Sequence, residues 1–144
     1  MFLFLSICLN SYSQTDSDYK EMLGFACGGT GSSSKTVKRV FGLLDKKKYA
    51  KIKRLLNSNN NAERFLSVII CEKLNELNEI ELDARNRETI DKIYMSDAKV
   101  FVCGGCTFYE KVSLKDLLKF NHEELVREET EDWVNNCFKK LNVN

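Results

Sequence analysis

The residues in this sequence whose types and spacing are best suited to chemistry are the two thiols of Cys103-Gly104-Gly105-Cys106. Two cysteines separated by two residues can close a disulfide, share a metal or act as a redox pair. A redox pair needs an electropositive environment, such as a following helix N-terminus, to lower the pKa of its attacking thiol. The residues after Cys106 (TFYEKV) do not predict a helix start, and the chain has no proline to face the pair. These observations favour a structural disulfide.

The remaining cysteines divide into two kinds. Cys71 and Cys137 lie on predicted apolar helix faces, where a thiol behaves as a small hydrophobic side chain. Cys27 lies in a predicted loop, so the disulfide candidates are Cys27, Cys103 and Cys106. A bond from Cys27 to either of the other two would close a loop of about 77 to 80 residues and stabilise the fold by roughly 4 kcal/mol. A zinc site could be built from these three thiols and His122. Structural zinc sites usually have two closely spaced ligand pairs, and here only Cys103 and Cys106 form one, so we predict no metal ligands.

Other motifs do not predict catalysis. Residues 29–36 (GTGSSSKT) look like a phosphate-binding P-loop, but Ser34 stands where a glycine is needed for the backbone to wrap the phosphates. We interpret this stretch as a linker that enters a helix. The single histidine offers no serine-histidine-acid set, and the paired glutamates are neighbours on one charged helix. We therefore expect no catalytic residues and no cofactor, and we favour a non-enzyme while leaving the question open.

Charge is balanced overall but segregated along the chain. Lysine and arginine total 22 against 21 acidic residues, so the net charge of +1 implies no strongly charged partner. Residues 46–54 (KKKYAKIKR) form a basic run that we interpret as the solvated face of an amphipathic helix, not as a nucleic-acid site. Residues 123–132 form an acidic run, which can attract the basic one within the fold or between copies.

The first thirteen residues (MFLFLSICLNSYS) carry no charged side chain and are apolar from Phe2 to Leu9. This run, followed by Ser11 and Ser13 at the −3 and −1 positions, predicts a signal peptide cut between Ser13 and Gln14. The run is too short to span a bilayer. We therefore expect an exported protein, periplasmic or secreted. The usual Lys/Arg segment before the apolar run is missing, which suggests that the natural start lies upstream.

After the signal peptide we expect a flexible polar lead-in at residues 14–34 and a single helical domain at 35–142. The longest apolar-periodic stretch, residues 60–77, predicts a central helix with Asn60 as N-cap and Glu63 completing a capping box. Five more helices are predicted from their caps and periodicity. These predicted caps are Ser34, Asp45, Asp83, Ser113 with Asp116, and Asn121. The predicted class is all-α, with about six helices in a compact bundle or short repeat array and one irregular or extended segment around the CGGC motif.

Residues 45–77 combine a short helix, a turn of Asn and Ser, and a more buried helix, and this pattern resembles one unit of a HEAT or armadillo repeat. The resemblance implies a scaffold or binding surface. Our leading interpretation is an exported, non-catalytic module with a structural or protein-interaction role. The partner would be another protein, and the oligomeric state stays open. The alternative is a periplasmic thiol-active protein that uses Cys103 and Cys106 for thiol-disulfide exchange or metal binding.

Overall fold

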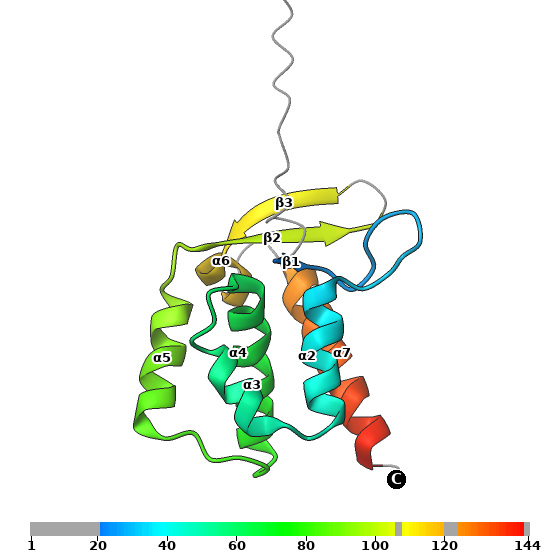
Figure 1. The fold of residues 1–144 in the computed structure, drawn as a ribbon. Helices are drawn as coiled ribbons and strands as arrows, with labels where there is room; N and C mark the ends of the chain where they lie inside the picture. Colours follow the sequence, from blue (N-terminus) through cyan, green and yellow to red (C-terminus); the bar gives the residue numbers. More distant parts are fainter. Residues whose placement is uncertain (1–20, 106–107, 120–123, 143–144) are drawn as a thin grey trace, which may run out of the picture.

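The structure, a computed structural model, describes residues 21–105, 108–119 and 124–142. Within these ranges the chain forms six helices and three strands (Figure 1). In chain order they are β1 (Met22–Leu23), α2 (Lys35–Asp45), α3 (Tyr49–Leu55), α4 (Asn61–Glu76), α5 (Ala84–Tyr94), β2 (Lys99–Gly104), β3 (Phe108–Ser113), α6 (Leu114–Leu118) and α7 (Glu124–Asn142). The sheet lies across one end of the helices.

The fold is mostly helical, as predicted, but it is not purely all-α, because a three-stranded mixed sheet accompanies the helices. The strand order is β1-β2-β3, with β1 parallel to β2 and β2 antiparallel to β3. The predicted extended segment corresponds to β2. β3 was missed because its FYEKVS sequence gives little alternation, and β1 because its two residues lie in the segment expected to be a flexible lead-in. Met22 and Leu23 are instead buried, and they pair with Phe101 and Val102 of β2.

The central helix is confirmed as α4, and ten of its sixteen residues are buried. Five helices and β2 all contact it, so the apolar residues around its circumference are covered from several sides. The Asn60 side chain caps α4 by accepting the N–H groups of Ala62 (2.9 Å) and Glu63 (3.2 Å). The predicted return bond from Glu63 to the Asn60 N–H is absent, because that N–H donates to Ser58 Oγ. The Glu63 carboxylate accepts from Arg39 of α2 and from Ser58.

The caps of three other helices are confirmed, and one is corrected. Ser34, Asp83 and Ser113 cap α2, α5 and α6 through their side chains. Asp45 does not open α3, because α2 continues through it and α3 begins only at Tyr49 without a side-chain cap. Lys47, with a φ of 49°, makes the sharp turn between these two helices. The predicted cap Asn121 lies outside the described residues. No helix among the described residues is long and apolar enough to cross a membrane.

A substitution at a buried residue of α4 tests this assignment of the core. Ile70 has no exposed surface, so Ile70→Ala leaves a cavity and is expected to lower the free energy of unfolding by about 2 to 5 kcal/mol. Lys51→Ala, on the exposed face of α3, serves as the control and should change it by less than about 0.5 kcal/mol. Urea unfolding measures both. Equal midpoints for the two variants would contradict this assignment of the core.

Candidate functional site: a disulfide and an interhelical groove

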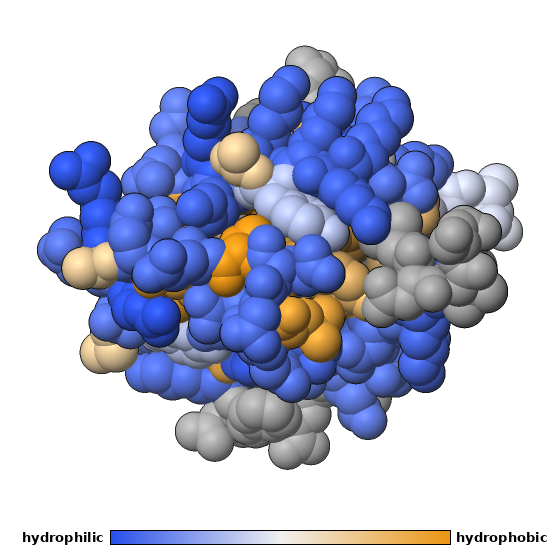
Figure 2. All heavy atoms as spheres, turned by 90° about the horizontal axis from the view of Figure 1, so that it is seen from below, coloured by the Kyte–Doolittle hydropathy of each residue, from blue (hydrophilic) through white to orange (hydrophobic). Residues whose placement is uncertain are grey.

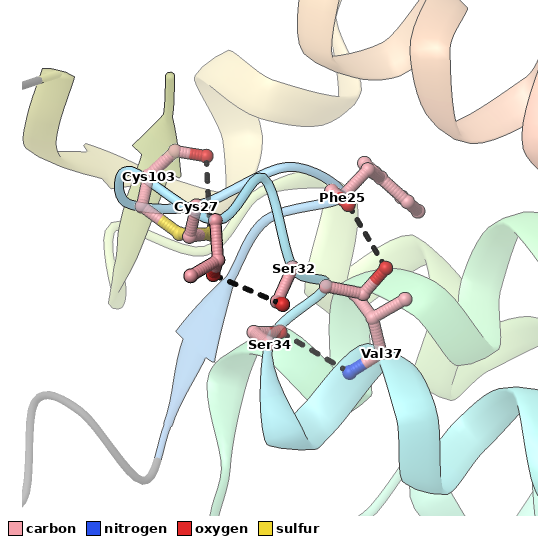
Figure 3. The surroundings of a disulfide bond; sticks show 8 residues. Phe25, Cys27, Ser32, Ser34, Val37 and Cys103 are labelled. Carbon is pink, nitrogen blue, oxygen red and sulfur yellow. Dashed lines mark hydrogen bonds between the residues drawn. A yellow bond between two sulfur atoms is a disulfide. The ribbon is translucent and has the colours of Figure 1, made fainter. Parts of the chain in front are cut away.

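A disulfide joins Cys27 to Cys103 (Figure 3). The Cα atoms are 5.6 Å apart, a separation typical of disulfides. Of the two partners that the sequence left open for Cys27, the structure selects Cys103. Cys106 lies outside the described residues. The bond links the loop after β1 to the end of β2, two segments that are 76 positions apart in sequence.

Backbone hydrogen bonds hold the two cysteines in register. The Cys27 N–H donates to Ser32 O across a tight loop, at 2.9 Å. The Gly28 N–H donates to Gly105 O, and the Gly105 N–H donates to Ala26 O, both at 2.9 Å. Gly28 and Gly105 have φ values of 68° and 56°, which glycine adopts without steric cost. Gly105 of the CGGC segment and Gly28 of the facing loop therefore have a structural role at this junction.

Gly24 is a site residue that sequence reasoning missed. A Cβ built on Gly24 would overlap the sulfur atoms of both Cys27 and Cys103 and the Cys103 carbonyl oxygen. Only a residue without a side chain can therefore pass so close to the disulfide. Nothing in the neighbouring sequence marks this glycine, because the atoms that it must avoid come largely from the distant strand β2.

The same loop leads directly into α2. The Ser33 hydroxyl donates to Phe25 O (2.9 Å), and the Ser34 N–H donates to Gly24 O (2.9 Å). The Ser34 hydroxyl then accepts the Val37 N–H to cap the helix (Figure 3). The stretch that looked like a P-loop thus forms the connection from the disulfide to α2, and the serine in place of glycine is the helix cap.

The other two described cysteines are buried and unpaired with each other. Burial raises the pKa of the Cys71 thiol to about 12 and the pKa of the Cys137 thiol to about 11. Both thiols are therefore protonated at neutral pH, and the thiolate is the nucleophilic form of cysteine. This agrees with their predicted role as small apolar side chains.

A pair of glycine substitutions tests the close approach at the disulfide. Gly24→Ala is expected to prevent the Cys27–Cys103 bond, so a free-thiol count should rise by two and the melting temperature should fall. Gly42→Ala in α2 is the control, because its Cβ meets no other atom. That change should be neutral or should stabilise the protein by up to about 1 kcal/mol through helix propensity. An unchanged thiol count in Gly24→Ala would contradict the geometry.

A groove of about 220 Å³ lies between α4 and α7. Its lining is mostly polar and charged, with two aliphatic residues. The residues are Ile69, Glu72, Lys73, Glu76, Arg127, Glu131, Val134 and Asn135. On each helix they recur at the three- and four-residue spacing of one face. Sequence reasoning missed the groove because periodicity does not tell which helix lies opposite.

The Glu72, Arg127 and Glu131 side chains of the groove have hydrogen-bond partners within the molecule. The Tyr94 hydroxyl lies 3.1 and 3.0 Å from the two carboxylate oxygens of Glu72, to which it can donate. Arg127 donates to the Glu131 carboxylate at 2.7 Å and to the carbonyl oxygen of Leu118. Burial raises the pKa of Glu72 above its ordinary value, although Tyr94 and Arg127 oppose the shift. Arg127 thereby links α7 to the end of α6.

The raised pKa of Glu72 predicts that its negative charge lowers the stability of the fold in a pH-dependent way. Above the ordinary glutamate pKa of 4.5, the charged form of Glu72 is less favourable in the folded than in the unfolded protein. Glu72→Gln is therefore expected to raise the urea midpoint at pH 7, since the amide oxygen can still accept from Tyr94. The advantage should disappear as the pH falls below about 4.5, where Glu72 is protonated in both states. A variant that is less stable than wild type at pH 7 would contradict this.

No protein-family model matches the sequence, and searches of curated proteins and of solved structures find no match. Among the described residues, no group of three or more His, Cys, Asp or Glu side chains is arranged to hold a metal ion.

Proposed function

We propose that this protein is an exported, disulfide-stabilised helical domain with a non-catalytic structural or protein-interaction role. The observation that carries the proposal is the Cys27–Cys103 bond, in which Cys103 is only 4% exposed. Cys27 is half-buried, and a disulfide that joins distant segments with one cysteine buried is typical of a permanent structural link, because exchange requires access by an attacking thiolate. Disulfides persist mainly in oxidising compartments. The bond therefore supports export, as does the apolar run at residues 1–13.

Three further observations support an interaction role. The helices α3 and α4 pack together over the region that resembles a HEAT or armadillo unit, a class that acts through exposed helix faces. Glu72 and Glu131 of the α4–α7 groove accept from Tyr94 and Arg127, an arrangement that suits a rigid surface better than proton transfer to a substrate. The exposed surface is rich in charged side chains, which confer specificity in protein recognition.

Processing at the signal peptide tests export. Expressed with its natural leader, the protein is expected outside the cytoplasm with Gln14 as its first residue, as N-terminal sequencing would show. Ser13→Arg should block cleavage, because the −1 position requires a small residue. Ser17→Arg is the matched control and should be processed normally. An intact Met1 on exported wild-type protein would contradict the predicted cleavage.

Thiol chemistry tests the non-catalytic role. At pH 8, iodoacetamide should label Cys71 and Cys137 at least about tenfold more slowly in the folded protein than in urea, because thiolate is scarce at their raised pKa values. Peptide mapping measures the labelling of each cysteine separately. The protein should also fail to accelerate insulin reduction by dithiothreitol. Insulin reduction that vanished in Cys103→Ser, with the fold intact, would instead establish the thiol-active alternative.

A further inference from the structure

Positive charge is concentrated in one part of this nearly neutral molecule. Residues 35–54 hold nine lysines and arginines and a single acid, Asp45, which gives them a formal charge of +8, against +1 for the whole chain. We define the basic face by seven of these side chains, which are exposed and take part in none of the ion pairs among the described residues. They are Lys35, Lys38, Lys46, Lys47, Lys48, Lys51 and Arg54.

The basic face follows α2, the turn after it and α3. Lys35 and Lys46 lie within about 20° of each other around the α2 axis, and the track between them is about 16 Å long. Gly42 lies on the same side, and a Cβ added there would meet no other atom, so this side of α2 is open. The turn lies at the end of the molecule seen in Figure 2, where hydrophilic residues surround a smaller hydrophobic centre. Such a track suits an extended chain better than a single small ion.

The turn carries lysine at a position where its backbone favours glycine. The Lys47 N–H donates to Leu44 O (2.9 Å), and the Lys48 N–H donates to Leu43 O (2.8 Å). These two hydrogen bonds make the Schellman motif that commonly ends a helix. The motif holds Lys47 at a φ of 49°, in the left-handed region where glycine or asparagine is usual. Stability of the fold therefore does not account for a lysine at this position.

Lys48 breaks a second local rule. It is the N-cap of α3, but its side chain makes no capping hydrogen bond, and the first turn of α3 has no acidic residue. Ser, Thr, Asp and Asn are preferred at an N-cap, and a cation there is repelled by the positive end of the helix dipole. Adjacent positions that break local rules with the same residue type indicate a functional site, where stability is lost in favour of binding.

Acids near the basic face form no ion pair with it among the described residues. Glu63 of α4 pairs instead with Arg39, which lies outside the face. Burial and, to a smaller extent, Glu79 raise the pKa of Tyr49, so Glu79 lies on the Tyr49 side of α3. That side is roughly 160° from Lys51 around the helix. The positive charge of the face is therefore left for a partner.

We propose that the basic face binds an acidic segment of a partner protein, whose aspartate and glutamate side chains are spaced along an extended chain. This inference rests on the proposed interaction role and names the chemistry of its partner. The complementary charges attract one another at the surface, where salt screens them, so binding is tightest at low ionic strength.

The composition of the face favours carboxylates over other polyanions. Six of its seven charges are lysines, which are compact point charges, whereas phosphate recognition favours the bidentate fork of arginine. Stacking of nucleic-acid bases needs exposed aromatic side chains, and docking to a membrane surface needs apolar anchors. On α2, α3 and the turn between them, Phe41 is the one exposed large hydrophobic residue. A protein segment therefore fits this face best.

Fluorescence anisotropy with a labelled peptide of ten glutamates tests the proposal on the full chain. The peptide should bind at about 20 mM NaCl, and its affinity should fall at least about tenfold at about 300 mM. An oligonucleotide of ten thymidines should bind more weakly, and phosphatidylglycerol vesicles should not sediment the protein. Tighter binding of the oligonucleotide, or sedimentation with the vesicles, would overturn the assignment to a protein partner.

Lys47→Gly separates binding from folding. Glycine adopts the φ of 49° without strain, so this variant should melt at the wild-type temperature or up to a few degrees higher. The lost charge should weaken peptide binding about two- to fivefold at low salt. A lysine with a merely structural role would not combine these two effects. A variant that melts lower than wild type, or that binds the peptide as tightly, overturns the proposal.

Charge reversal at two exposed lysines tests whether position matters. Lys51→Glu, on the basic face, should weaken peptide binding about fivefold or more. Lys99→Glu is the matched control, because Lys99 begins β2 in the sheet at the other end of the helices (Figure 1), and it should bind within about twofold of wild type. Circular dichroism melting confirms that both variants are folded.

Equal losses in Lys51→Glu and Lys99→Glu would show that only net charge matters and would overturn the proposal. Wild type that fails to bind the glutamate peptide at low salt overturns it as well. Neither result affects the proposed function, whose tests measure export and thiol reactivity.

Discussion

Burial of α4 is the constraint on which the rest of the structure depends. A helix with apolar residues around most of its circumference is stable in water only when neighbours cover it on several sides. The other five helices and β2 provide that cover. The Asn60 cap and the Arg39–Glu63 ion pair fix where α4 begins relative to α2. Once α4 is placed, the neighbouring helices have few alternative arrangements.

Local signals in the sequence identify most of the helices. Ser34, Asn60, Asp83 and Ser113 all cap the helices predicted from them, because a cap and its first turn are encoded within four residues. Asp45 failed as a cap because Lys46 to Lys48 form a turn before α3 begins. β1 could not be found in this way, since two residues carry no period and gain their hydrogen bonds only from β2.

The candidate site was partly predictable for a similar reason. Cysteine counting placed Cys27 and Cys103 among the residues that can pair, because a thiol outside a helix is noticeable in any sequence. The choice of Cys103, the need for Gly24 and the groove between α4 and α7 all depend on which distant segments meet. Glu72, Tyr94 and Arg127 likewise come from three different helices. No local sequence pattern shows which distant segments come into contact.

The Cys27–Cys103 bond also determines how the molecule would respond to a mechanical load. A force applied at the two ends of the chain passes through the disulfide, so the segment between the two cysteines, which contains α2 to α5, cannot be drawn out. Only the residues before Cys27 and those after Cys103, including β3, α6 and α7, can extend. Under oxidising conditions the central helix would thus stay within a closed loop while the C-terminal helices detach, and reduction of one bond would release the remaining length.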